Sequence, residues 1–185
     1  MSPKPVTIFC GSKSGNNAQF EAAAAELGKT LAERGFDLIY GGGAKGMMGA
    51  VANSALAAGG NVTGIIPQIL IEWERQHQSL THVIITKDMH ERKKMLYENG
   101  LAGIVLPGGF GTLDEMFEML TWNQLSIHNK RIYILNTAGF YDHLILHLEH
   151  LIEKDFLYEP LWERIHAFSN PLDLVNALEK NLSNT

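Results

Sequence analysis

The chain has 185 residues, of which 15 are lysine or arginine and 20 are aspartate or glutamate, giving a formal charge of −5 at pH 7. Its content of 45% hydrophobic and 19% charged residues excludes a disordered or low-complexity protein. Its length predicts one domain over residues 1–185 with a sizeable core. A net acidic chain binds polyanions poorly, so we expect no nucleic acid partner, and any anion site must be a local cluster of donors.

Cys10 is the only cysteine, which excludes an internal disulfide and CxxC metal sites. The eight histidines match neither HExxH nor HxH spacing, so we expect no metal ion. The N-terminus carries only the short apolar run Val6–Cys10, and no segment approaches the roughly 18 apolar residues of a membrane span. We therefore expect a soluble cytoplasmic protein without a membrane partner.

Short β-branched segments alternate with segments of helical periodicity along the chain. Strands are expected at Val6–Cys10, Asp37–Tyr40, Val62–Ile66, Val83–Thr86, Ala102–Leu106, Arg131–Leu135 and, as an edge strand, Arg164–Phe168. Helices are expected from the N-cap Asn17 to Gly35 and over Met47–Ala58, Met89–Tyr97, Thr112–Leu125, Tyr141–Glu153 and Pro171–Leu182, whereas Leu70–Leu80 has no assignment. The alternation predicts an α/β fold: a Rossmann-like, doubly wound, mainly parallel sheet with helices on both faces. Such sheets bind ligands at the carboxyl ends of strands, near a topological switch point.

The segment Pro107–Glu115 (PGGFGTLDE) follows a predicted strand and opens a predicted helix. Its glycines allow a tight turn and the close approach of an anion to backbone amides, and Thr112 is placed to cap the helix and donate a hydroxyl. The free N–H groups and the helix dipole then suit a phosphate. The segment is neither a P-loop nor GxGxxG. The competing interpretation is a tight structural turn.

Glu115 lies one turn into this helix, and its position supports two roles equally. It is placed either to complete a capping box or to face the sugar of a bound ligand. Glu118 and Thr121 follow at intervals of three, so these polar residues share one broad face. We expect Phe117, Leu120 and Met116 on the core side.

A second cluster, Asp88–Met95, lies early in a predicted helix. Arg92 and Lys93 supply the local positive charge that an acidic protein needs for an anionic ligand. A guanidinium can fork onto phosphate or ribose oxygens, whereas an ammonium acts as a point charge. Considered alone, the cluster is more typical of a solvated helix face.

The glycine-rich segment Gly41–Gly49 has two equal interpretations: contact with a nucleotide, or close packing of the helix that follows. Met47 and Met48 are expected in the core. Cys10 is expected to be a buried strand thiol rather than a nucleophile, because the sequence places no basic group beside it.

Together these segments resemble the Lonely Guy (LOG) family of nucleoside 5′-monophosphate phosphoribohydrolases, which activate cytokinins. The family patterns PGGxGTxxE, MHxRK and GGGxxGxMG match Pro107–Glu115, Met89–Lys93 and Gly41–Gly49, and the similarity extends through Cys10–Ser12 and Thr121–Leu125 to about Leu151. Relatives are often labelled lysine decarboxylases. That reaction needs pyridoxal phosphate on a Schiff-base lysine with an acidic partner, and no lysine here has a recognisable setting of that kind.

The resemblance implies a homodimer with its site near the interface, which releases free base and ribose 5-phosphate from an adenosine-type monophosphate without a cofactor. It implies Arg92 and Glu115 as the catalytic pair. The substrate-binding residues that it implies are Glu74 (with Glu72 close by), Met89, Lys93, Gly108, Gly109, Phe110, Gly111, Thr112 and Thr121. The chain departs from the family pattern at Lys13, Lys45, Ser126 and Arg131, which leaves base selectivity open. An isopentenylated base needs an apolar slot, for which Trp73, Met89, Leu96 and Trp122 are candidates.

By analogy with glycosidases, the bond from ribose to base is expected to break through an oxocarbenium-like state. Glu115 would stabilise that charge or activate water, and Arg92 would hold phosphate or ribose and keep Glu115 ionised. Two alternatives stay open. A non-catalytic nucleotide or cofactor carrier, such as the molybdenum-cofactor carriers that share this architecture, would use Glu115 as a cap. A nucleoside deoxyribosyltransferase-like enzyme would form a covalent intermediate on it.

Overall fold

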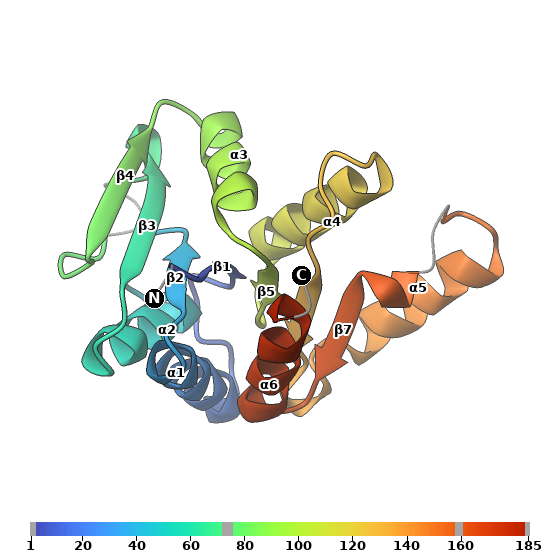
Figure 1. Cartoon of the computed structure of the whole chain (residues 1–185), viewed down its shortest axis with the longest axis horizontal. Coiled ribbons are helices and arrows are strands. Elements are labelled where there is room, and N and C mark those ends of the chain that lie inside the picture. The colour runs from blue at the N-terminus through green and yellow to red at the C-terminus, as the bar shows by residue number, and fades with distance from the viewer. Residues whose placement is uncertain (1–2, 72–75, 158–160, 184–185) are drawn as a thin grey trace.

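The computed structural model describes residues 3–71, 76–157 and 161–183. Its centre is a seven-stranded sheet in the order β4-β3-β2-β1-β5-β6-β7, and every neighbouring pair of strands is parallel (Figure 1). The strands are β1 (Pro5–Phe9), β2 (Asp37–Tyr40), β3 (Val62–Pro67), β4 (His82–Thr86), β5 (Gly103–Val105), β6 (Ile132–Leu135) and β7 (Ile165–Phe168). The predicted Rossmann-like α/β fold is therefore confirmed.

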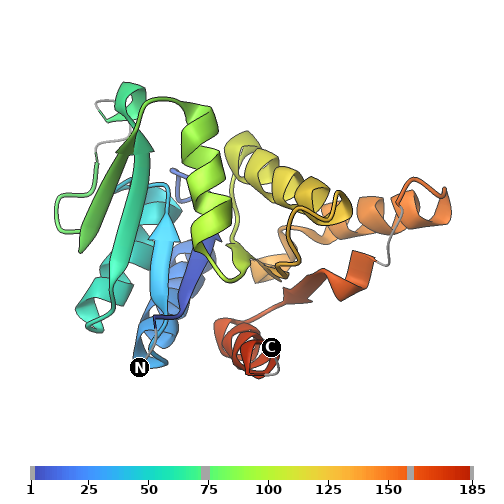
Figure 2. The same cartoon turned by 45° about the horizontal axis from the view of Figure 1, so that its top comes forward.

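Helices cover both faces of this sheet (Figures 1 and 2). They are α1 (Ala18–Glu33), α2 (Gly46–Ala57), α3 (Met89–Asn99), α4 (Phe110–Gln124), α5 (Asp142–Glu153) and α6 (Pro171–Leu182), with short 3₁₀ turns at Gln68–Leu70, Thr137–Gly139 and Leu161–Glu163. Helices α1, α2 and α6 pack on one face, and α3, α4 and α5 pack on the other. Among the described residues, no helix is both long and apolar enough to cross a membrane.

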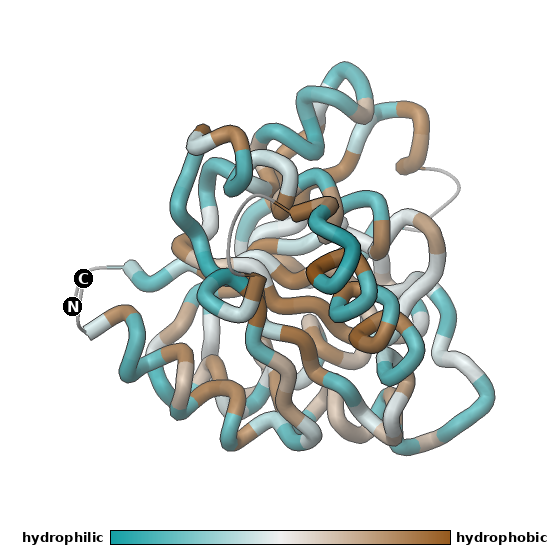
Figure 3. The backbone as a smooth tube through the Cα atoms, turned by 90° about the vertical axis from the view of Figure 1, so that its right-hand side faces the viewer, coloured by the Kyte–Doolittle hydropathy of each residue, from teal (hydrophilic) through white to brown (hydrophobic). Residues whose placement is uncertain are grey.

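The alternation of side chains along β1 divides the core between the two faces. Val6 and Ile8 join the cluster under α1, α2 and α6, whereas Phe9 joins the cluster under α3 and α4. A strand that is buried on both faces must be apolar at consecutive positions, which explains the short apolar runs of the sequence. Figure 3 shows these hydrophobic segments gathered inside and the hydrophilic ones concentrated in the surrounding loops and helices.

The start of α4 corrects one expectation. The helix begins at Phe110 with Gly109 as its N-cap, so Thr112 lies buried within the first turn and does not cap it. The capping-box role of Glu115 is excluded for the same reason. Phe117, expected on the core side, is 37% exposed, because Met116, Met119 and Leu120 occupy the buried face.

The strand order places a topological switch point between β1 and β5. From β1 the chain builds outward through β2, β3 and β4, and then returns to add β5 on the other side of β1. The loops that leave the carboxyl ends of β1 and β5 therefore diverge and leave a crevice between them. After β3, the turn Gln68–Leu70 leads into the unassigned region Leu70–Leu80, where an isolated bridge joins Gln76 to Gly43.

Candidate active site

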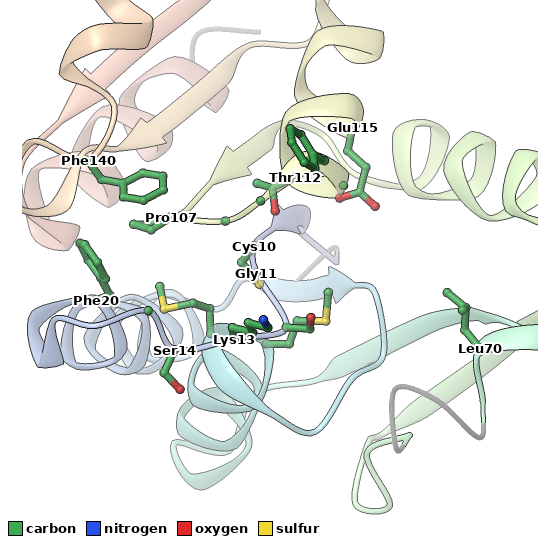
Figure 4. Close-up of a pocket in the computed structure, with 18 of the residues that line it drawn as sticks. Cys10, Gly11, Lys13, Ser14, Phe20, Leu70, Pro107, Thr112, Glu115 and Phe140 are labelled. Atoms are coloured by element: carbon green, nitrogen blue, oxygen red, sulfur yellow. The ribbon is translucent and has the colours of Figure 1, made fainter.

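A pocket of about 510 Å³ occupies this switch point (Figure 4). Its walls come from the loop after β1 (Cys10–Gly15), the loop after β5 (Pro107–Gly109) and the first turn of α4. Further lining residues come from the helices, the turn after β3 and the segment after β6: Phe20 of α1, Met47 and Met48 of α2, Leu70, Met89 and Arg92 of α3, Glu115 of α4, and Phe140. The predicted position of the ligand site is thus where the pocket lies.

The two loops touch through their backbones. The Gly11 N–H donates to the Pro107 carbonyl at 3.1 Å. A Cβ added to Gly108 would lie 2.1 Å from Thr112 Oγ1 and 2.9 Å from Gly11 N. Position 108 therefore requires glycine for close approach, as the motif suggested.

The N-terminus of α4 opens into the pocket. Its N-cap Gly109 supplies no side-chain acceptor, and in the described part of the chain no acceptor bonds to the N–H groups of Phe110 and Gly111. Phe110, Gly111 and Thr112 all line the pocket. Free amides and the positive end of the helix dipole make this turn suitable for a phosphate.

Arg92 and Glu115 form a buried ion pair at the side of the pocket. Asp88 caps α3 by accepting from the Glu91 N–H at 2.8 Å, and this hydrogen bond lowers the pKa of Asp88. Arg92 follows one turn later and donates from Nη1 to Glu115 Oε1 at 2.9 Å. The two side chains are only 5% and 9% exposed. Arg92 also donates from Nε to the Ile65 carbonyl at 3.0 Å, so its guanidinium is held from two sides.

The glycine-rich loop after β2 makes room for this guanidinium. A Cβ on Gly41 would lie 2.3 Å from Arg92 Nη2. Further along, a Cβ on Gly49 would lie 2.3 Å from the Ala44 carbonyl oxygen, so the loop also permits close packing. Of Gly41–Gly49, only Met47 and Met48 line the pocket, and both are also buried in the core as expected.

Two residues that the family resemblance assigned to the substrate lie outside this pocket. Lys93 points to α4, where it pairs with Asp114 at 3.2 Å and with Glu118. Burial acts to lower the pKa of Lys93, but its hydrogen bonds to Glu118 and Asp114 outweigh burial and raise that pKa. Thr121 lies on the exposed side of α4 and donates to the Phe117 carbonyl.

Glu74, Glu72 and Trp73 fall outside the described residues. Of the other candidates for an apolar slot, Met89 lines the pocket. Leu96 is buried in the core, and Trp122 packs edge-on against Tyr97 instead.

The lining residues that the sequence did not place in the site include Lys13, Phe20, Leu70 and Phe140. Phe20 and Phe140 meet edge to face with ring centroids 5.5 Å apart, and Figure 4 shows them at the opposite end from Glu115. A signal existed for Phe140, since it follows β6 and all parallel strands end at the same edge.

Cys10 lies on the pocket wall but is only 3% exposed. Burial and, next in size, the negative charge of Glu115 raise the pKa of its thiol, against the opposing effect of Arg92. The thiol therefore stays protonated at neutral pH and is a poor nucleophile, in agreement with the expectation from sequence.

Fold and pocket together define a Rossmann-like α/β protein with an open helix N-terminus beside a buried arginine–glutamate pair. A family model described as "Possible lysine decarboxylase" matches residues 48–178. A probable cytokinin riboside 5′-monophosphate phosphoribohydrolase, LOGL5 of Oryza sativa subsp. japonica, is 39% identical over 95% of this chain and 71% of its own length. Cytokinin riboside 5′-monophosphate phosphoribohydrolase LOG1 of Arabidopsis thaliana is 38% identical over 95% of this chain and 83% of its own. The chain therefore belongs to the LOG family, and the resemblance inferred from its motifs is confirmed.

Solved structures show how widely the fold is used. The molybdenum cofactor carrier protein of Chlamydomonas reinhardtii superposes with a TM-score of 0.76 at 19% identity, over 98% of this chain and 99% of its own. The molybdenum cofactor binding protein of Rippkaea orientalis gives 0.74 at 20% identity, with the same coverage. At these identities the likeness shows the fold alone.

Proposed function

We propose that this chain is a hydrolase that cleaves the N-glycosidic bond of adenosine-type 5′-monophosphates, including cytokinin ribosides, to give the free base and ribose 5-phosphate. The observation that carries the proposal is the buried pair of Arg92 and Glu115 beside the open N-terminus of α4. A phosphate on that helix end would place the attached ribose within reach of a fixed carboxylate. The names of the curated relatives support the same reaction.

In the proposed function, the pocket holds the substrate mainly through its 5′-phosphate. It carries about −1.5 to −2 charges at pH 7 and accepts hydrogen bonds from the amides of Phe110 and Gly111 and from the Thr112 hydroxyl. Its binding energy holds the sugar in position for attack. A nucleoside that lacks the phosphate should therefore be a poor substrate.

Glu115 stabilises the positive charge that develops on the ribose as the bond to the base breaks, and it orients or deprotonates the attacking water. Arg92 holds Glu115 in place and keeps it ionised, because an adjacent cation favours the charged carboxylate. Beyond Glu115, Met89 and Leu70 offer apolar surface for the base, and Figure 4 shows Leu70 on that side. The position of Met89 in the pocket lining supports the substrate-binding role expected for it.

The direct test incubates the protein with AMP and, separately, with isopentenyladenosine 5′-monophosphate, and follows both products by chromatography. Stoichiometric free base and ribose 5-phosphate support the proposal, and the ratio of the two rates reports base preference. Transfer of ribose to an added second base, or a ribosyl adduct on Glu115, would favour the transferase instead. Binding without turnover would favour a carrier.

We also propose that two copies of the chain associate through the outer side of α4. Phe110, Phe117 and Leu125 are 93%, 37% and 65% exposed on this helix and its C-cap, and Ile127 just beyond it is 58% exposed. Exposed apolar residues gathered on one element favour an interface over open solvent. Thr121 lies between Phe117 and Leu125 in helical spacing, so it would lie at that interface.

A further inference from the structure

The charges that line the pocket are few. Among the described residues, three lining side chains are charged: Lys13, Arg92 and Glu115. Arg92 and Glu115 are ion-paired with each other at 2.9 Å and cancel. The net positive charge of the pocket therefore comes from Lys13, at a position where this chain departs from the first loop of its family.

The backbone at Lys13 is firmly held. Its loop is fixed on both sides, because the Gly11 N–H donates to Pro107 and the Gly11 carbonyl accepts from Met48 N–H at 3.2 Å. A Cβ on Gly46 would lie 2.6 Å from the Lys13 carbonyl carbon, so the loop is packed directly onto the start of α2.

The side chain of Lys13, by contrast, is uncommitted. It is exposed and lines the pocket, and within residues 3–71, 76–157 and 161–183 its ammonium has neither an ion pair nor a hydrogen bond. Figure 4 shows Lys13 beside Gly11, across the pocket from Thr112 at the start of α4. An ammonium placed there faces the same space as the helix N-terminus.

We propose that Lys13 is the counter-charge for the substrate's 5′-phosphate and that it sets the enzyme's preference for phosphorylated over unphosphorylated ligands. This proposal rests on the proposed function. A helix N-terminus offers the equivalent of about half a positive charge, which is well short of a phosphate dianion. Lys13 supplies a full charge from the opposite wall.

In this proposal, different residues of the pocket bind the phosphate and act on the ribose. Phosphate binding falls to Lys13 and α4, so Arg92 keeps its bond to Glu115 when the substrate binds. The buried pair then acts on the ribose alone. This differs from the assignment suggested by the sequence, in which Arg92 was a candidate ligand of the phosphate.

The test uses ribose 5-phosphate and adenine as separate probes, with dissociation constants measured by calorimetry. Lys13→Met should weaken ribose 5-phosphate binding by about 10- to 100-fold, the usual worth of a charged hydrogen bond, and leave adenine binding unchanged. Lys13→Arg should bind both probes nearly as the wild type does. Lys29→Met, which changes the net charge equally but lies nine residues (about 14 Å) along α1 from Phe20, should bind both normally.

Two further readouts separate a phosphate contact from a change in pocket shape. The factor by which wild type binds ribose 5-phosphate more tightly than Lys13→Met should be smaller at pH 5 than at pH 7.5. The reason is that the phosphate loses its second charge near pH 6. With AMP, Lys13→Met should raise KM by a larger factor than it lowers kcat.

Unchanged ribose 5-phosphate binding in Lys13→Met, or an equal loss for adenine, would overturn the proposal. So would a wild-type protein that does not bind ribose 5-phosphate. A wild-type protein that binds it but releases no base from AMP would contradict the proposed function instead, and the comparison of Lys13 variants would still be decisive.

Discussion

The Nη1 atom of Arg92 lies 2.9 Å from Oε1 of Glu115, and this contact joins α3 to α4 at the side of the pocket. Both side chains are almost fully buried. A charge buried at such a position is tolerable only while its partner is present. The pair is therefore both a structural clamp and, in the proposed function, the chemical centre.

Separating these two contributions gives the first prediction. Arg92→Met should lower the free energy of unfolding by about 3 kcal/mol, because it removes the cation that faces the buried carboxylate of Glu115. The double variant Arg92→Met with Glu115→Leu should regain most of that stability, since an apolar pair replaces the ion pair, yet show no turnover. Urea denaturation and base release measure the two effects. A double variant that is less stable than Arg92→Met would contradict the pairing argument.

The second prediction concerns Gly41, which lies against the guanidinium of Arg92, a member of the proposed catalytic pair. In Gly41→Ala the new methyl group would collide with Arg92 Nη2 at 2.3 Å, and the Ile65 carbonyl and Glu115 leave the guanidinium little freedom to retreat. We expect kcat/KM to fall by about 100-fold, as a misplacement near 1 Å can cause. Circular dichroism should show an intact fold. Wild-type kinetics would mean that the guanidinium has room to move.

The third prediction tests the proposed dimer. Sedimentation of the wild type should give the mass of two chains, and Leu125→Asp should give one chain, because it places a charge in an apolar interface. Leu172→Asp serves as a matched control, since Leu172 is 47% exposed on α6 rather than α4. If Leu125→Asp stays dimeric, or if Leu172→Asp also dissociates, the interface lies elsewhere.

His77 yields a prediction about pH. It is buried, its Nε2 lies 2.9 Å from Asn53 Oδ1, and its Nδ1 accepts from the Ser79 N–H at 3.2 Å. Burial lowers its pKa below the ordinary value of about 6.5. At a pH between the folded and unfolded pKa values, the His77 imidazole binds a proton only in the unfolded chain. The contribution of His77 to the free energy of unfolding is therefore full above pH 6.5 and is lost as pH falls through the folded pKa.

Thermal midpoints between pH 7.5 and pH 5 measure this effect. His77→Gln should show a shallower decline than wild type over that range. The pKa values of His128 and His166 are also lowered, mainly by burial, so some decline should persist in the variant. Identical slopes in both proteins would exclude a contribution from His77.

Much of the fold could be predicted from the sequence because its signals are local. Asn17 caps α1 as its side chain suggested, Pro171 begins α6 as expected, and the alternation of strand and helix predicted the parallel sheet. The start of α4 was misjudged because Thr112 is a good capping residue in general, while the actual cap, Gly109, gives no side-chain signal.

The site was less predictable because it depends on distant contacts. Nothing local to Arg92 says that its guanidinium meets Glu115, 23 residues away, or that Gly41 makes room for it. The family patterns supplied the pair but also placed Lys93 and Thr121 at the substrate, outside the pocket of this chain. In the sequence, Lys13 was notable only as a departure from the family pattern. Its proposed role depends on the ion pair between Arg92 and Glu115, whose charges cancel, and the sequence does not show that contact.

The most direct measurement of the central claim is adenine release from AMP by wild type and Glu115→Gln. Glutamine keeps the shape of the side chain and can still accept from Arg92, but it lacks the negative charge. We expect wild type to release adenine and ribose 5-phosphate, and the variant to lose about 10²- to 10⁴-fold in kcat. Asp114→Asn, one residue away and outside the pocket, should retain turnover. Near-wild-type turnover by Glu115→Gln would contradict the account.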